Sequence, residues 1–232
     1  MGNNYFAIIQ ARLGSKRFPR KMLSRIGDYS LIEWVLKRIK KCKNLDGIIL
    51  ATSNLQDDMN LFETAIQEGL LAYRGSETNV YDRFIKASEY YKVDKIIRIC
   101  GDNPFVDPYE IDKLVDFYKK NEYDYVCNHM NKLNNLYADG FGAEILSKKI
   151  LESFEKDNLT PSHREHVTSY IWDNQKKYRI HAIKAPKSLA YPEYSFDIND
   201  KKDLSYINDL VLNGVELFSK AEEIMRIASS VK

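Results

Sequence analysis

Short apolar runs alternate along the first half of the chain with segments whose apolar residues recur every three or four positions. The apolar runs are typical of buried β-strands and lie at residues 5–9, 47–52, 70–73, 95–100 and 123–128. The amphipathic segments between them predict α-helices at residues 31–42, 58–69, 78–91 and 107–121. Strands alternating with helices predict an α/β fold, in which right-handed crossovers join a mostly parallel central sheet with helices on both faces.

Several helix starts carry their own signals. Ser30 and Glu33 have the spacing of a capping box, and so do Asp107 and Glu110. Pro108 stands at the first helical position, where proline is well tolerated. These signals support the predicted helices from 31 and from 107.

The alternation changes after residue 128. We predict a short strand at 140–145, a helix capped by Ser147, a helix at 162–177 and strands at 178–184 and 194–198. A helix capped by Asp200 and a terminal helix from Ser219 complete the chain. No repeat, low-complexity segment or flexible linker separates these parts. We therefore expect one domain over residues 1–232, with an inserted, lid-like region near 129–190.

A basic loop follows the first predicted strand. Its five cations are Arg12, Lys16, Arg17, Arg20 and Lys21. Gly14 allows a close approach of the backbone to a ligand, and Pro19 stiffens the second half of the loop. A charged, solvated loop is the simplest explanation, but these cations lie beside Gly and Pro rather than on a helix face. Because open α/β sheets bind ligands at the carboxyl ends of their strands, the loop predicts a site for an anion, most simply a polyphosphate.

Carboxylates at two other strand ends are candidates for a metal site. Asp102 follows the strand at 95–100, and Asp197 lies at the end of the late strand at 194–198. Each is equally compatible with a turn or capping role. With the basic loop, they favour metal-assisted phosphoryl or nucleotidyl transfer, in which carboxylates hold magnesium.

Four further residues are weaker candidates. Asp139, in a loop beside Gly140, either faces a ligand or belongs to an ordinary turn. Arg74, at a strand end, is a candidate for contact with a base or ribose. His163 and His166 are three residues apart on a helix, but no third ligand accompanies them, so a polar helix start is favoured over a zinc site.

Composition narrows the class of protein. The chain has 35 Lys and Arg against 33 Asp and Glu, a balance that does not support general nucleic-acid binding. Cys42, Cys100 and Cys127 fit no zinc or redox spacing. No apolar run reaches the roughly 20 residues of a membrane helix. The first strand begins at Tyr5, which leaves no room for a signal peptide, so a cytoplasmic protein without membrane partners is expected.

These motifs together resemble the CMP-sugar synthetases, and most closely the spore-coat polysaccharide cytidylyltransferase-like branch. The matching segments, in order along the chain, are 9–21, 73–77, 80–83, 98–104, 139–140, 164–168, 196–197 and 201–204. The resemblance implies a Rossmann-like GT-A nucleotidyltransferase fold that binds CTP and Mg²⁺, usually as a homodimer. It implies transfer of CMP to an acidic sugar or a phosphorylated small molecule, with release of pyrophosphate, in surface-polysaccharide precursor synthesis.

The resemblance also implies roles for individual residues. Arg12 and Lys21 are the expected catalytic residues, which hold the phosphates and stabilise transition-state charge. Asp102 and Asp197 are the expected Mg²⁺ ligands. Contacts with the nucleotide are expected from Ala11, Arg12, Gly14, Ser15, Lys16, Lys21, Arg74, Cys100 and Asp102. Contacts with the acceptor are expected from Asp139, Glu165 and His166.

Two departures keep other functions open. Cys100 stands where the sialic-acid and Kdo enzymes often place a base-contacting Gln. The segment 196–200 reads Phe-Asp-Ile-Asn-Asp instead of the usual Val-Asp-Thr-Pro-Glu. One alternative is a GT-A glycosyltransferase, although Asp102-Asn103-Pro104 lacks the second Asp of the usual Asp-x-Asp motif. The other is a non-catalytic nucleotide-binding module, which retention of both Asp102 and Asp197 disfavours.

Overall fold

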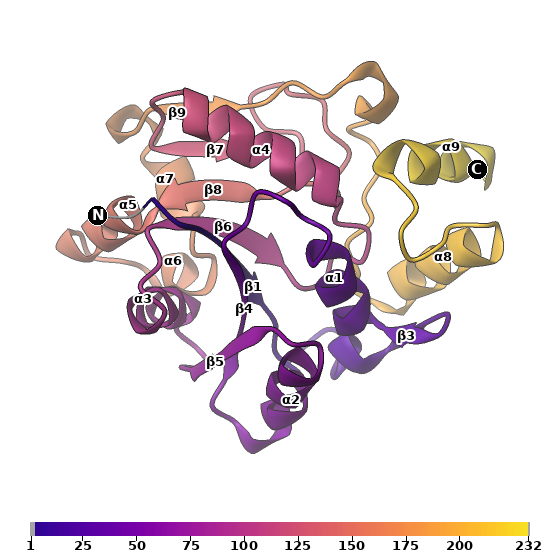
Figure 1. Cartoon of the computed structure of the whole chain (residues 1–232), viewed down its shortest axis with the longest axis horizontal. Helices are drawn as coiled ribbons and strands as arrows, with labels where there is room; N and C mark the ends of the chain where they lie inside the picture. Colours follow the sequence, from indigo (N-terminus) through magenta and orange to yellow (C-terminus); the bar gives the residue numbers. More distant parts are fainter. Residues whose placement is uncertain (1–2, 232) are drawn as a thin grey trace.

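A seven-stranded sheet runs through the centre of the protein, whose computed structural model describes residues 3–231 (Figure 1). The strand order is β5-β4-β1-β6-β8-β7-β9. The strands are β1 (Tyr5–Gln10), β4 (Gly47–Ser53), β5 (Leu71–Gly75), β6 (Lys95–Cys100), β7 (Tyr125–Cys127), β8 (Glu144–Ser147) and β9 (Ile180–Ala182). β1 pairs in parallel with β4 and β6, whereas β8 runs antiparallel to both of its neighbours.

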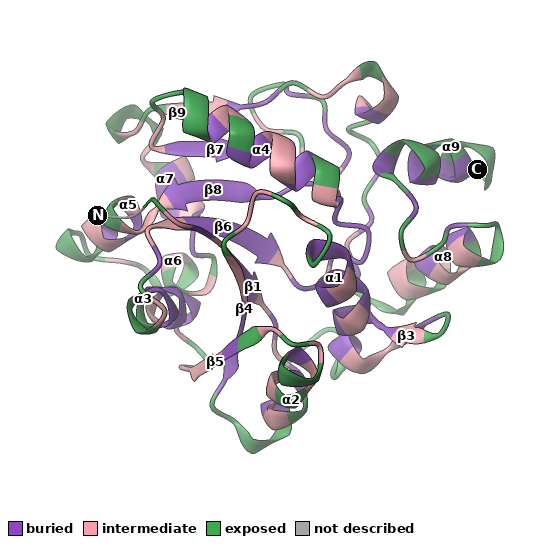
Figure 2. Cartoon of the chain, viewed as in Figure 1, coloured by how far each residue is buried: buried purple, intermediate pink, exposed green. Residues whose placement is uncertain are grey.

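Helices cover both faces of this sheet. They are α1 (Leu31–Ile39), α2 (Met59–Gln67), α3 (Val80–Tyr90), α4 (Pro108–Lys120), α5 (Lys148–Ser153), α6 (Pro161–Glu165), α7 (Ser169–Asp173), α8 (Lys201–Leu212) and α9 (Ala221–Val231). Ala7 and Ile9 of β1 pack in one core with α1, α4, α8 and α9, and Ile8 packs in a second core with α3, α5 and α7 (Figure 2). Successive side chains of a strand point to opposite faces, so β1 is buried on both sides. The predicted α/β architecture is confirmed.

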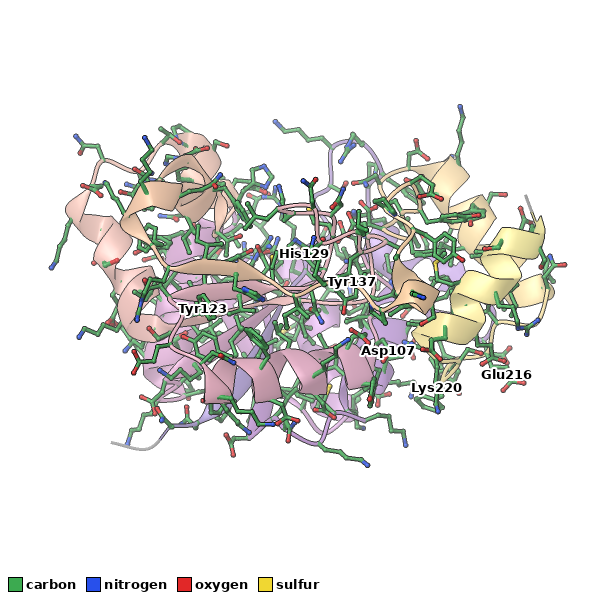
Figure 3. All side chains as sticks on the ribbon, turned by 90° about the horizontal axis from the view of Figure 1, so that it is seen from above. Asp107, Tyr123, His129, Tyr137, Glu216 and Lys220 are labelled. Carbon is green, nitrogen blue, oxygen red and sulfur yellow. The ribbon has the colours of Figure 1, made fainter. Side chains whose placement is uncertain are left out.

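The predicted N-caps Ser30 and Asp107 form in the structure, but the second predicted capping box is incomplete, since the Glu110 carboxylate accepts the Tyr137 hydroxyl instead of the Asp107 N–H. Ser30 and Glu33 make the reciprocal bonds of a capping box at the start of α1. Asp107 accepts hydrogen bonds from the backbone N–H groups of Tyr109 and Glu110 at the start of α4. Its other oxygen, Oδ2, accepts the N–H of Ala221 at 2.8 Å, which fixes the start of α9. Figure 3 shows Asp107 and Lys220 together at this end of the molecule, with Tyr123 beyond the far end of α4.

The second half of the chain differs from the predicted pattern. The region 129–190 contributes β8 and β9 to the main sheet. The predicted strand at 140–145 is replaced by β8, because the backbone around Gly142 packs tightly on Asn128; a Cβ on Gly142 would lie 2.2 Å from the Asn128 carbonyl oxygen. The predicted strand at 194–198 is reduced to one bridge between Asp139 and Ser195. A hairpin of β2 (Arg25–Ile26) and β3 (Tyr29–Ser30) was not predicted.

The predicted helix at 162–177 is also divided. It consists of α6, α7 and a short 3₁₀ turn at Gln175–Lys177. At the break, the Thr168 hydroxyl donates to the buried Glu144 carboxylate at 2.8 Å. No helix in the described range 3–231 is both long enough and apolar enough to cross a membrane.

Glu144 is the centre of a buried polar network below the sheet edge. Its carboxylate pairs with Arg98 and accepts hydrogen bonds from the hydroxyls of Tyr125 and Thr168. Burial alone would raise the pKa of Glu144, but the charge of Arg98, the nearby His129 and the hydrogen bonds from Tyr125 and Arg98 lower it to about 2. The network joins β6, β7 and β8 to the segment between α6 and α7.

Replacing Glu144 by Gln is expected to reduce the free energy of unfolding by about 3–5 kcal/mol, because Arg98 is left as an unpaired buried cation. Urea denaturation followed by circular dichroism measures this loss. Because the folded pKa of Glu144 is depressed, its contribution is present above pH 4.5 and is lost as the pH falls toward 2. Asp124→Asn is the control, since Asp124 pairs with an Arg179 side chain that is 60% exposed. Equal losses in both variants would contradict the prediction.

Candidate active site

A cavity of about 380 Å³ opens at the carboxyl ends of β1 and β6. The chain leaves β1 into the basic loop and leaves β6 into the turn that carries Asp102, so both segments line the cavity. Nine of the predicted site residues are in its wall: Ala11, Arg12, Ser15, Lys16, Lys21, Cys100, Asp102, Glu165 and His166. The structure therefore brings together residues that are more than 150 positions apart in the sequence.

Leu13 anchors the basic loop. Its side chain is buried, and its N–H donates to Asp58 Oδ1 at 2.7 Å. The Leu13 carbonyl oxygen accepts the N–H groups of Ser15 and Arg20, both at 2.9 Å. One apolar residue among the cations thus folds the loop back on itself and leaves the neighbouring side chains free to face the cavity.

Lys21 lies at the end of the loop, in a 3₁₀ turn that spans Lys21–Leu23. Its side chain is 9% exposed, and Nζ donates to Asp102 Oδ2 at 2.8 Å. Nζ also donates to the Ile198 carbonyl oxygen at 2.6 Å. The Ile198 N–H in turn donates to the Asp102 backbone oxygen at 2.9 Å. Lys21 therefore joins the basic loop to both carboxylate-bearing segments, at 102 and at 197–198.

Arg12 also lines the cavity. Its Nη2 donates to Glu165 Oε1 at 2.7 Å, and its Nη1 donates to the Glu77 carbonyl oxygen at 3.0 Å. Glu165 is the last residue of α6 and is about one-third exposed, so it can be displaced by an anion that competes for Arg12. Arg12 and Lys21 are thus each paired with a carboxylate at the edge of the cavity.

Asp102, the ion-pair partner of Lys21, lies near two further aspartates, Asp139 and Asp197. Burial, followed by the negative charges of Asp197 and Asp102, raises the pKa of Asp139 to about 7. Such crowding of carboxylates is relieved by a cation, and an all-oxygen donor set suits Mg²⁺ or Mn²⁺. The described residues contain no ready-made group of three acidic, His or Cys ligands. The residues therefore fit a hard cation that takes its remaining ligands from phosphate and water, as Mg²⁺ commonly does.

The structure does not bring every predicted residue to the cavity wall. Gly14 faces the Glu77 side chain, whose Oε1 would lie 3.2 Å from an added Cβ. Asp139 and Asp197 are not in the wall, although the charges of Asp197 and Asp102 both act on Asp139. The prediction for Arg74 differs most. Its guanidinium donates to the carbonyl oxygens of Ser53 and Leu55, because the side chain turns back over the end of β4.

The sequence analysis missed several residues of the wall. Among them are Gln10, Arg83, Arg98 and Asn199. Arg98 interrupts an otherwise apolar strand, and Arg83 lies on the buried face of α3 beside Val80 and Phe84. A charged residue in a position that the pattern assigns to the core is the signal that would have identified both.

The histidine pair does not form a metal site in the described residues. His163 Nε2 lies 2.8 Å from Asp173 Oδ2, and His163 Nδ1 accepts the N–H of Thr160. His166 lines the cavity instead. His163 lies in the first turn of α6 and bonds to the cap residue Thr160, in agreement with the polar helix start that the sequence favoured.

Comparisons with known proteins identify relatives of this chain. The sequence model of a family described as cytidylyltransferase matches residues 6–225. An uncharacterized protein of Methanocaldococcus jannaschii is 35% identical over 97% of this chain and 94% of its own. The spore coat polysaccharide biosynthesis protein SpsF of Bacillus subtilis is 34% identical, over 90% of this chain and 86% of its own. A solved cytidylyltransferase structure from Leptospira borgpetersenii has a TM-score of 0.90 at 24% identity and covers 98% of this chain and 94% of its own. The predicted Rossmann-like nucleotidyltransferase fold is confirmed.

Proposed function

The chain belongs to the cytidylyltransferase family, whose members are CTP-dependent nucleotidyltransferases, and from this premise we propose that it transfers CMP from CTP to an acidic sugar or a phosphorylated small molecule. Pyrophosphate is the second product, and the activated acceptor is a precursor of surface polysaccharide. The observation that carries the proposal is the contact of Lys21 with Asp102, which joins a cation of the basic loop to a carboxylate that we propose as a ligand of Mg²⁺.

The chain's own residues account for binding and orientation of CTP. Arg12 and Lys21 hold the phosphates and stabilise the charge that develops as the α-phosphorus is attacked. The acceptor oxygen forms the new bond to that phosphorus, and the bond to pyrophosphate breaks. Asp102 and Asp197 would hold Mg²⁺, which supplies Lewis-acid stabilisation of the phosphate oxygens when bound.

The acceptor lies on the side of the cavity that faces α6. Glu165 and His166 line the cavity, and Asp139 is close enough to Asp102 for their charges to interact. Carboxylate and imidazole groups can hydrogen-bond the hydroxyl groups of a sugar. The family resemblance favours a homodimer as the active form.

A thermal-shift panel of CTP, UTP, ATP, GTP and dTTP, each with and without Mg²⁺, tests the proposal first. A ligand that binds only the native state raises its stability by RT ln(1 + [L]/Kd). A selective, Mg²⁺-dependent shift with CTP supports the proposal. The acceptor is then identified by pyrophosphate release from CTP with acidic sugars and with phosphorylated polyols. A shift with nucleotide sugars but with no triphosphate would instead support the glycosyltransferase alternative.

Replacing Glu165 by Gln is expected to tighten CTP binding by about two- to fivefold, because the triphosphate no longer competes with a partly exposed ion pair for Arg12. Isothermal titration calorimetry measures the change in Kd. Glu152→Gln is the control, because Glu152 forms a comparable ion pair with Lys148 on α5, away from the cavity. Weaker CTP binding in the Glu165 variant would mean that Glu165 contacts the nucleotide directly.

A further inference from the structure

Arg83 is a buried cation in the cavity wall, and no carboxylate within residues 3–231 forms a direct ion pair with it. It lies one turn into α3 and is 1% exposed. In the described part of the chain its guanidinium donates only to backbone carbonyl oxygens. The carboxylates of Asp58, Glu165 and Glu77 are near enough to offset part of the cost of burying this charge. Burial of a cation without a direct ion pair is still costly, so its presence at the cavity indicates a function beyond packing.

Arg83 organises the turn between β5 and α3. Its Nε donates to the Ser76 carbonyl oxygen at 2.9 Å, and its Nη2 donates to the Glu77 carbonyl oxygen at 3.0 Å. The same Glu77 oxygen accepts Nη1 of Arg12, also at 3.0 Å. Arg83 and Arg12 therefore share one acceptor, whose position Arg83 determines.

A second shared acceptor connects Arg83 with the backbone of the phosphate loop. The Ala51 carbonyl oxygen, near the end of β4, accepts the Ala11 N–H at 3.3 Å and Arg83 Nη1 at 3.4 Å. Arg83 thus supports the start of the loop at two points, one on its backbone and one on the Arg12 side chain. The planar guanidinium is suited to this bridge, because it directs several N–H groups at fixed angles.

We propose that Arg83 is a positioning residue, which holds the Arg12 guanidinium in place to bind the triphosphate of the nucleotide. The inference rests on the proposed function, because it assigns the ligand of Arg12 as a nucleoside triphosphate. Burial, together with the nearby charge of Arg12, lowers the pKa of Arg83 to about 10, so Arg83 remains charged at neutral pH. Once phosphate displaces Glu165, the shared Glu77 oxygen is the remaining protein contact that orients Arg12.

Titration calorimetry with CTP and with CMP, in the presence of Mg²⁺, tests this role. In Arg83→Gln the Kd for CTP is expected to rise at least about tenfold, while that for CMP changes less than about threefold, because CMP lacks the outer phosphates. Arg83→Lys is expected to resemble Arg83→Gln, because an ammonium group cannot bridge the Ala51 and Glu77 oxygens. Full rescue by Lys would show that only the charge matters and would overturn the positioning role.

Arg38→Gln is the matched control. Arg38 is also 1% exposed and donates to backbone carbonyl oxygens, those of Val106, Leu217 and Phe105, but among the described residues it does not line the cavity. The Kd for CTP of this variant is expected to stay within about twofold of wild type. A large rise in Kd in both variants would indicate a general effect on the fold and would overturn the specific role of Arg83.

A double-mutant cycle with Arg12→Ala completes the test. If Arg83 acts through Arg12, Arg83→Gln should change the Kd for CTP less than about twofold when Arg12 is already Ala. Additive effects, or an unchanged Kd in both Arg83 variants, would overturn the proposal. Thermal melting followed by circular dichroism checks that each variant is folded. If Arg83→Gln does not fold, the Kd of Arg83→Lys for CTP alone tests the positioning role. Absence of wild-type binding to all five nucleoside triphosphates would instead refute the proposed function.

Discussion

Asp102→Asn is expected to reduce turnover by about 10³-fold, because it removes one of the two carboxylates that would hold Mg²⁺. Each factor of ten in turnover corresponds to about 1.4 kcal/mol of transition-state stabilisation. Asn has nearly the same shape, and the hydrogen bond from the Ile198 N–H to the Asp102 backbone oxygen is retained, so the fold stays intact. Pyrophosphate release at saturating CTP and acceptor measures turnover. Electron paramagnetic resonance of Mn²⁺ measures cation binding without turnover.

The control for Asp102→Asn removes an acidic charge elsewhere. Asp57 is exposed in the turn after β4, and Asp57→Asn is expected to leave both turnover and Mn²⁺ binding unchanged. A variant of Asp102 that kept normal Mg²⁺-dependent turnover would remove this residue from the site. Loss of turnover with unchanged Mn²⁺ binding would instead assign Asp102 a role in orienting Lys21.

The first half of the fold could be predicted because its signals are local. Apolar runs such as 5–9 and 48–51 have no charged or strongly polar position to be solvated. Capping residues such as Ser30 and Asp107 mark the helix starts within one residue. The second half could not be predicted as well. There, contacts between distant residues outweigh local preference: Gly142 packs on Asn128, and Thr168 donates to Glu144 at the point where a continuous helix was expected.

The site could be predicted where a charged residue directly follows a strand whose place in the sheet was also predicted. Lys21 and Asp102 each follow a strand whose neighbours in the sheet are set by the parallel pattern, so their contact follows from topology. Arg74 and Arg83 show the limit of this reasoning. Both are near the end of β5, but the direction of each side chain depends on backbone carbonyl oxygens that the sequence does not reveal. Its position at a strand end led to Arg74 being predicted as a nucleotide contact, whereas Arg83, which is buried on α3, is the one that lines the cavity.

Lys21→Met is expected to lower turnover by about 10²–10³-fold, the loss typical of removing one preorganised donor to developing negative charge. Met fills most of the volume of the Lys stem, which is largely buried, so stability should change little. The same substitution frees Asp102 from its ion pair. Mn²⁺ binding to the protein without nucleotide should therefore be retained or strengthened, in contrast to the Asp102 variant. Pyrophosphate release and Mn²⁺ resonance measure the two effects.

Lys21→Met and a control variant together show whether Lys21 binds phosphate or only neutralises the charge of Asp102. Arg20→Met is the control for Lys21→Met, because Arg20 belongs to the same loop but does not line the cavity among the described residues. It removes the same charge and should leave turnover within about twofold of wild type. If Lys21 only neutralised Asp102, then Lys21→Met would lose stability and cation selectivity but keep turnover. Loss of turnover with intact Mn²⁺ binding would place Lys21 on the phosphates, where the loop and the metal-binding carboxylates meet.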